Sequence, residues 1–405
     1  MKRFVVLFIG ILLLLVMPKV YAKDTVYSLN KYDKEEYKYI IKDQNGGYLT
    51  LGTYEQEKEK HILIVDYKKD GSIRWQLNNK EYDAEELYGV TNSYGEDGKI
   101  NSYLLVVKKD SFKFWKINLD GEFIEEKETN LYGTVELESI IETTDKTGYL
   151  LFGTIDAKAF IAKYDESLNL IWIKTYDNMK KIKELVDEYE AGYYGIVEVD
   201  DTYKLIKFDH EGNEISTIKE DFELITNPHL LQRDDSYLVY GYTTDVKLNN
   251  TDSGSYFIIR YGLDDNIIWE TIGDEPVDDN KLIRLEETNH NYYLLHTNSN
   301  DNSIEVSRIN EDGVIEEKVK KLKNDYYDMN DFIFNHNVLY FIGQINCPEE
   351  DNCDYNAKSL LLVSSEDKVI EVEDKDSKNI LITTGIIIVL TGILYFYKKK
   401  KKLKK

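Results

Sequence analysis

The feature that most limits how this 405-residue chain can fold is a repeat with a period of about 48 residues. In each copy a small or turn-forming residue precedes a tyrosine, or a valine in the last copy, and an aliphatic run follows. These positions are Tyr48, Tyr103, Tyr149, Tyr193, Tyr237, Tyr292 and Val338. A second signature, a tight turn after an apolar run, recurs at Gly71, Gly121, Leu168, Gly212, Asp265, Gly313 and Asp367. Such a fixed period indicates one supersecondary unit copied along the chain.

Each repeat has room for four short strands. In the first copy the strand-like runs are 37–41, 48–53, 61–67 and 72–77. The 33 tyrosines favour strands over helices. Four strands in forty to fifty residues are typical of a β-propeller blade. We therefore predict an all-β, seven-bladed β-propeller of four-stranded blades within residues 23–374. Residues 25–29 are expected to pair as the outer strand of the last blade, which closes the ring and removes its exposed edges.

Three tryptophans support the repeat. Trp75, Trp172 and Trp269 each lie four residues after a turn, and both intervals between them are 97 residues, or two repeats. We interpret them as packing residues of the repeat. One stretch conflicts with the period, because Met179, Ile182 and Leu185 have helical spacing where the repeat places an inner strand. We follow the repeat and predict a strand there.

The turn motifs carry a resemblance. The Gly71-x-x-x-Trp75 turn, with Lys163-Tyr164-Asp165 and Lys207-Phe208-Asp209 before equivalent turns, resembles secreted bacterial β-propeller repeat proteins and, distantly, quinoprotein-type repeats. The resemblance implies the propeller fold and a surface location. It brings no ligand, because quinoprotein repeats keep the tryptophan in most blades and this chain keeps it in three.

The pattern of residues 1–22 predicts a secretory signal peptide. A basic start at Lys2 and Arg3 precedes an apolar run, and Ala22 offers a small residue at the cleavage point. An uncleaved anchor is the alternative, but the apolar run is short for a membrane span.

The opposite end predicts a membrane anchor. After a short linker at 375–379, an uncharged run extends from Ile380 to Tyr397, long enough for a transmembrane helix. The lysine-rich tail at 398–405 places this end in the cytoplasm by the positive-inside rule. The predicted location is the cell membrane, with a single pass and the propeller outside. Thr384-Gly385 and Thr391-Gly392 repeat seven residues apart, so the span has a small-residue face for weak self-association.

Sortase-type anchoring to the cell wall is the alternative interpretation of the C-terminal segment. The run Leu381-Ile382-Thr383-Thr384-Gly385 resembles a sorting signal, but the motif has proline where this chain has Ile382. The five residues also lie inside the apolar run rather than before it.

The charge of the chain excludes one class of partner. Its formal net charge is −24, and the two ends hold basic residues outside the predicted domain. A surface this acidic repels nucleic acid, whose binding depends on lysine and arginine contacts to phosphates.

The longest predicted loops come from the last three repeats, at 243–255, 297–303 and 344–358. Long loops on a rigid scaffold often bind ligands. The candidate ligand-binding residues in these loops are Asp245, Asp252, Asn300, Asp301, Asp351 and Asp354. Oxygen ligands of this kind suit Ca²⁺, with Asp351 and Asp354 as its candidate ligands, but no run has the spacing of a known calcium loop. A solvated acidic loop is the simpler reading.

Cys347 and Cys353 are the only cysteines and lie in one predicted loop. In an extracellular protein this spacing favours a disulfide that pins the loop. Neither the spacing nor a nearby histidine supports a zinc site.

No catalytic motif is present among the six scattered histidines or around the serines. The sequence therefore favours a protein- or glycan-binding or scaffold module over an enzyme, with no cofactor beyond calcium. A propeller hydrolase or lyase acting on cell-surface glycans is the alternative, because propellers host both functions.

Overall fold

A computed structural model describes residues 25–27, 33–43, 46–78, 84–95, 99–188, 192–219, 225–243, 254–273, 277, 283–288, 290–323, 327–335, 338–345 and 358–365. The predicted signal peptide, the predicted span, the lysine-rich tail and both cysteines lie outside these residues. All of the described strands belong to one compact unit, residues 1–367.

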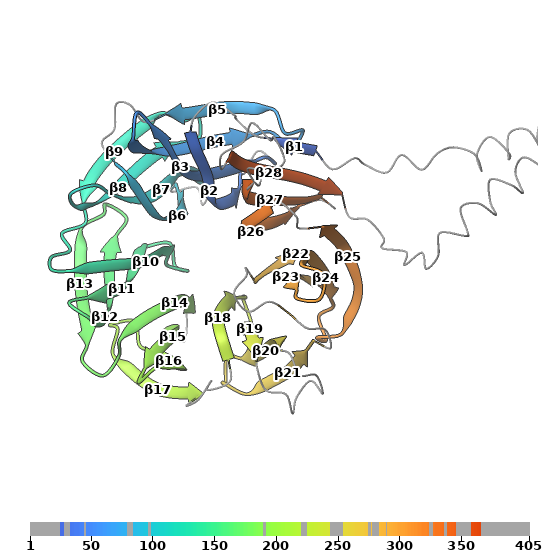
Figure 1. The fold of residues 1–405 in the computed structure, drawn as a ribbon. Helices are drawn as coiled ribbons and strands as arrows, with labels where there is room; N and C mark the ends of the chain where they lie inside the picture. Colours follow the sequence, from blue (N-terminus) through green and yellow to red (C-terminus); the bar gives the residue numbers. More distant parts are fainter. Residues whose placement is uncertain are drawn as a thin grey trace, which may run out of the picture. The chain divides into compact units, whose positions relative to one another are not determined.

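The described strands form seven four-stranded antiparallel sheets, which we number in chain order (Figure 1). Sheet 1 is β2 (Asp33–Lys42), β3 (Tyr48–Gln56), β4 (Glu59–Tyr67) and β5 (Ile73–Asn78). Sheet 2 is β6 (Glu86–Tyr94), β7 (Ile100–Lys108), β8 (Phe112–Asn118) and β9 (Phe123–Glu128). Sheet 3 is β10 (Val135–Glu142), β11 (Gly148–Ile155), β12 (Lys158–Asp165) and β13 (Leu170–Tyr176). Sheet 4 is β14 (Lys181–Glu188), β15 (Gly192–Val199), β16 (Thr202–Phe208) and β17 (Glu214–Lys219).

The remaining sheets follow the same order. Sheet 5 is β18 (Ile225–Gln232), β19 (Ser236–Thr243), β20 (Ser255–Gly262) and β21 (Ile267–Ile272). Sheet 6 is β22 (Arg284–Thr288), β23 (Asn291–Asn298), β24 (Ser303–Ile309) and β25 (Ile315–Lys323). Sheet 7 is β26 (Tyr327–Asn335), β27 (Val338–Ile345), β28 (Lys358–Ser365) and β1 (Thr25–Tyr27). The prediction of an all-β propeller with four-stranded blades is confirmed.

Sheet 7 joins the two ends of the repeat array. β1 pairs antiparallel with β28, with Thr25 opposite Val363 and Tyr27 opposite Leu361. The predicted outer strand at 25–29 is therefore present over residues 25–27. This pairing covers the backbone edge of β28 and ties the first strand of the chain to the last.

The hydrophobic core is divided among the spaces between neighbouring sheets. Leu51 and Ile64 of sheet 1 pack with Leu105 and Trp115 of sheet 2. A cluster of the same kind lies between each other neighbouring pair, and the last one joins sheet 7 back to sheet 1 through residues such as Tyr340. Each core is small, so a chain of this length avoids the large single core that becomes inefficient beyond about 250–300 residues.

Six of the seven predicted turn positions are described and share one backbone conformation, while Asp367 lies outside the described residues. The φ angle is +81° at Gly71, +60° at Leu168 and +64° at Asp265, and Gly121, Gly212 and Gly313 are also left-handed. This conformation suits the tight hairpins that join the third and fourth strands of sheets 1 to 6. The stretch with helical spacing is strand β14, as the repeat period predicts. Among the described residues, no helix is long and apolar enough to cross a membrane.

Candidate functional site

The loop residues predicted to bind a ligand are only partly described. Asp245, Asp252, Asp351 and Asp354 lie outside the described residues, as do Cys347 and Cys353. Within the described part of the chain, no group of three or more histidine, cysteine or acidic side chains could hold a metal ion. The calcium and disulfide predictions therefore stay predictions.

Asn300 and Asp301 lie in the exposed turn between β23 and β24, where they hold the turn together. The Asn300 amide donates to Asn298 Oδ1 at 2.9 Å, and the Ser303 hydroxyl donates to Asp301 Oδ1 at 2.6 Å. Lys321 lies 2.8 Å from Asp301 and 2.9 Å from the buried Glu305. Hydrogen bonds from Lys321 and Ser303 lower the pKa of Asp301 to about 2. Both residues thus serve the local structure.

A feature that the sequence analysis missed is a repeated β-bulge in the innermost strands. The pairing of the first two strands shifts by one or two residues in sheets 1, 2, 3, 4, 5 and 7. The residue after each bulge pairs with a residue in the middle of the second strand. The first strand of sheet 6 has no such shift, and there Arg284 is the residue that pairs with the middle of the second strand. We call these residues the inner ring: Tyr39, Gly89, Ser139, Glu184, His229, Arg284 and Asp331. Bulges commonly re-aim side chains near functional sites.

The first strands of the sheets lie nearest the centre in Figure 1. The inner-ring members of sheets 4 to 7 contact one another from sheet to sheet. His229 Nδ1 is hydrogen-bonded to Glu184 Oε1, and the Leu230 amide donates to Glu184 Oε2 at 2.5 Å. Arg284 Nη1 lies 3.4 Å from His229 Nδ1 and 3.5 Å from its Nε2. Arg284 Nε is 3.6 Å from Asp331 Oδ1, and Asp331 Oδ2 accepts the Ile40 amide at 3.5 Å.

The charged side chains of the inner ring are confined to four neighbouring sheets. Sheets 1 to 3 contribute Tyr39, Gly89 and Ser139, which carry no charge near neutral pH. Sheets 4 to 7 contribute an arc of ionisable side chains, Glu184, His229, Arg284 and Asp331. We call these four residues the charged arc. The prediction of a long loop at 297–303 is wrong, because β23 extends to Asn298 and β24 begins at Ser303, which leaves only the turn 299–302. The predicted loops at 243–255 and 344–358 lie mostly outside the described residues.

The charged arc is packed closely and still meets solvent. The side chains of Glu184, Arg284 and Asp331 are 27%, 33% and 21% exposed. Burial lowers the pKa of His229, which keeps the ring neutral as it donates to Glu184. Burial alone would raise the pKa of Glu184, but His229, Arg284 and the Leu230 amide outweigh it and lower that pKa. The arc therefore offers a carboxylate, a neutral imidazole and a guanidinium side by side.

Two further ionisable groups adjoin the charged arc. Glu286 lies two residues after Arg284 on β22 and forms a 3.1 Å ion pair with Lys42 of β2. Burial raises the pKa of Glu286 to about 7, although Lys42 opposes the shift. Lys183, the bulge residue of β14, is hydrogen-bonded to Asn227, and burial lowers its pKa to about 8. Several ionisable groups with shifted pKa values in one place are typical of functional sites.

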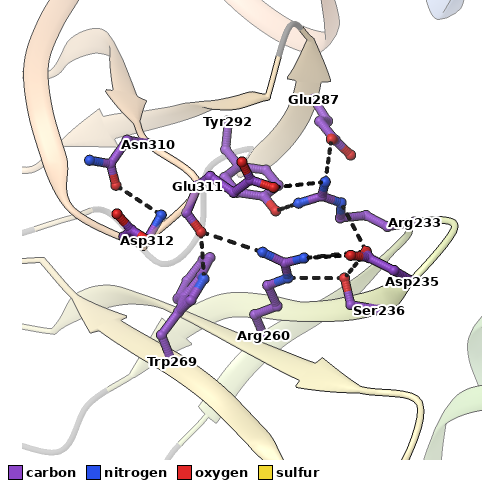
Figure 2. Close-up of polar contacts among 10 residues, drawn as sticks. All are labelled: Arg233, Asp235, Ser236, Arg260, Trp269, Glu287, Tyr292, Asn310, Glu311 and Asp312. Carbon is purple, nitrogen blue, oxygen red and sulfur yellow. Dashed lines mark hydrogen bonds and ion pairs between the residues drawn. The ribbon is translucent and has the colours of Figure 1, made fainter.

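A second polar cluster lies at the turns between sheets 5 and 6 (Figure 2). Arg260 Nη2 is 3.2 Å from both carboxylate oxygens of Asp235, and its Nε donates to Ser236 at 3.0 Å. Arg233 Nη2 lies 3.2 Å from Glu287 and 3.6 Å from Glu311. Both arginine side chains are less than a tenth exposed and are paired with carboxylates. We call Arg233, Arg260 and their carboxylate partners the clasp, because their contacts link sheet 5 to sheet 6.

A related clasp joins sheets 1 and 2. Arg74 Nη1 lies 2.6 Å from both Asp43 and the fully buried Asp66, and the Tyr103 hydroxyl donates to Asp43 at 3.1 Å. Asp66 occupies the position that holds a basic residue in sheets 2 to 6, so sheet 1 reverses the charges of the repeat.

The tryptophans of the repeat pack against the following sheet. A Cβ built on Gly121, Gly212 or Gly313 would meet the ring of Trp75, Trp172 or Trp269 at 2.6, 2.8 and 2.6 Å. The Trp75 indole donates to the Leu119 carbonyl at 2.8 Å, and the Trp269 indole to the Glu311 carbonyl at 2.9 Å. Each of these side chains therefore joins two sheets.

Comparison with known proteins supports the fold only. No protein-family model and no curated protein matches the chain. The β-propeller domain of the trilobed protease from Pyrococcus furiosus is 12% identical, with a TM-score of 0.50 over 84% of this chain and 99% of that one. A putative 6-phosphogluconolactonase from Bacteroides fragilis is 12% identical, with a TM-score of 0.46 over 76% of this chain and 97% of that one. This chain is a β-propeller. The evidence is the strand pairing, the small hydrophobic cores between neighbouring sheets, and the similarity to the Pyrococcus domain.

Proposed function

We propose that this protein is a seven-bladed, membrane-anchored extracellular propeller that binds a protein or glycan ligand at the innermost strands. The observation that carries the proposal is the charged arc, in which four consecutive sheets contribute contacting ionisable side chains, and three of them, Glu184, Arg284 and Asp331, stay partly exposed to solvent around the buried His229. A purely structural set of charges would be expected to resemble the clasp of Arg233 and Arg260, whose side chains are almost fully buried and closely paired.

A binding panel tests this proposal. The full chain is titrated with cell-surface oligosaccharides, peptides and wall polymers, and binding is followed by the change in melting temperature and by calorimetry. A ligand of the inner ring should bind R284Q and D331N at least tenfold more weakly. The matched control is R308Q, since Arg308 lies in the same sheet and pairs with Glu316 and Glu317 away from the ring. Ligands that bind all three variants equally well would show that another surface is used.

The location is a separate part of the proposal. The apolar run from Ile380 to Tyr397 and the lysine-rich tail support an anchor whose propeller faces outward. Protease added to intact bacterial cells that express the chain should then digest residues 23–374 and leave a C-terminal fragment in the membrane fraction. Protection of the propeller until the cells are lysed would contradict this topology.

Two smaller expectations accompany the location. Outside the cell, Cys347 and Cys353 should form a disulfide, which mass spectrometry without reduction would detect. Any self-association of the span should depend on the Gly385 and Gly392 face and should disappear when both are replaced by isoleucine. Two free thiols, or an unchanged crosslinked dimer, would contradict the respective expectation.

A further inference from the structure

Arg284 differs from the other described arginines in how it is paired. Arg74 has a carboxylate oxygen at 2.6 Å, Arg233 and Arg260 at 3.2 Å, and Arg308 at 2.6 Å. For Arg284 the corresponding distance, to Asp331, is 3.6 Å. A guanidinium has five donor hydrogens in a planar fork that fits a carboxylate in a bidentate way. Arg284 is thus the described arginine whose nearest carboxylate oxygen is farthest away.

The unused donors of Arg284 lie on one edge of the fork. Nε faces Asp331, and Nη1 contacts the Ile283 carbonyl at 3.2 Å and the imidazole of His229. Among the described residues, Nη2 has no hydrogen-bond partner. The Arg284 side chain is 33% exposed, so its free donors are open to solvent. An oxyanion of a ligand could replace water there and form charge-assisted hydrogen bonds with them.

The surroundings of Arg284 restrict which oxyanion fits. Asp331 and Glu184 flank it, and Glu286 lies two residues further along β22. Lys42 and Lys183 adjoin the same carboxylates, so the site carries charges of both signs. A ligand with only negative charge would contact the guanidinium but be repelled by the carboxylates. A ligand that also carries an ammonium group could place it among the carboxylates, which accept hydrogen bonds from ammonium donors.

The geometry points to a zwitterionic ligand, a carboxylate with a nearby primary ammonium, as in an amino acid or short free peptide, held at the inner ring. Its carboxylate would accept hydrogen bonds from Arg284, and its ammonium would donate to Asp331 or Glu286. This inference rests on the proposed function and narrows it to one chemical class. The charged arc supplies both halves of the recognition, while Gly89 and Ser139 leave the opposite side of the ring small.

The test uses the full chain and four probes: L-alanyl-L-alanine, its N-acetyl form, its C-terminal amide, and inorganic phosphate. We expect measurable calorimetric binding of the free dipeptide and at least tenfold weaker binding of the other three. R284Q should abolish the preference for a free carboxylate, and D331N or E286Q should reduce the preference for a free ammonium. R308Q should bind like the wild type. Circular dichroism and melting temperature confirm that each variant is folded.

Each other outcome argues against the inference in a distinct way. Equal binding of the N-acetyl dipeptide or phosphate would show an anion site without ammonium recognition and overturn the zwitterion. No binding of any probe, together with glycan binding that R284Q weakens, would overturn the zwitterion and leave the proposed function in place. Probe binding that R284Q does not change would overturn both the inference and the inner ring as the binding surface.

Discussion

The indole of Trp269 in sheet 5 lies directly against Gly313 in the turn of sheet 6, where a Cβ would come within 2.6 Å of the ring. Gly313 also has a left-handed backbone, with φ of +80°. The glycine is therefore required twice, by its conformation and by the tryptophan of the neighbouring sheet. The indole hydrogen bond to the Glu311 carbonyl fixes the same turn.

Replacing Gly313 by alanine should lower the free energy of unfolding by about 2–4 kcal/mol, because it adds a clash to an unfavourable φ. In a W269A background the clash is gone, and only the conformational cost of about 1 kcal/mol should remain. Urea unfolding of the four proteins of this double-mutant cycle measures the difference. An equal cost in both backgrounds would mean that Trp269 does not constrain the turn.

The contact between tryptophan and turn glycine explains the 97-residue interval seen in the sequence. Gly121, Gly212 and Gly313 each follow a sheet that ends in a tryptophan strand. The intervening turns hold Leu168 and Asp265, which adopt a left-handed φ without glycine. The fold was predictable because these local patterns recur at a fixed period, and because in sheets 1 to 6 the third and fourth strands are joined by a turn with a sequence signature.

The candidate site was not predictable to the same degree. His229 and Arg284 are 55 residues apart and become neighbours only through the ring. The bulge in the inner strands of sheets 1 to 5 and 7 interrupts the alternation of inward and outward side chains, so periodicity alone assigns the wrong face there. Only the pairing register aligns the seven positions. The same register shows that Leu339, rather than Val338, holds the position of the repeat tyrosine in sheet 7. Leu339 lies three residues before Ile342, which pairs with Asp331, as Tyr48 lies three residues before Leu51, which pairs with Tyr39.

The clasp in Figure 2 should be sensitive to the shape of its arginines as well as to their charge. R260K keeps the charge but loses the planar fork that contacts both oxygens of Asp235 and the Ser236 hydroxyl. We expect a loss of about 1–2 kcal/mol in the free energy of unfolding, since a buried arginine loses hydrogen bonds. R308K is the control, because Arg308 is more exposed and should cost under about 0.5 kcal/mol. Equal effects would show that the clasp adds nothing beyond a surface ion pair.

Glu286 should make the stability of the protein depend on pH in a defined direction. Its pKa is raised by burial to about 7 in the folded protein, against 4.5 for an ordinary glutamate. Between these values the folded state binds more protons than the unfolded state, so stability falls as the pH rises from about 4.5 to 7. E286Q removes this term, and relative to the wild type it should gain about 1–3 kcal/mol between pH 5 and pH 8.

Urea unfolding of the wild type and E286Q at several pH values measures this difference. K42M provides a second check, since Lys42 holds the pKa of Glu286 down and its removal should extend the pH-dependent range upward. A difference between wild type and E286Q that does not vary with pH would contradict the assignment.

Lys183 should be an unusually reactive amine near neutral pH. Burial lowers its pKa to about 8, so about half of it is uncharged at pH 8, whereas an ordinary lysine is almost fully protonated there. Trace labelling with acetic anhydride, followed by mass spectrometry, should modify Lys183 roughly tenfold or more faster than Lys181 at pH 7.5. Lys181 is a suitable reference because it lies on the same strand and is paired with Glu138 at 2.5 Å. Glu184 raises the pKa of Lys183, so E184Q should move the onset of labelling to lower pH. Equal labelling of the two lysines would show that the pKa of Lys183 is not lowered. An onset that moves to higher pH in E184Q would show that Glu184 does not raise that pKa.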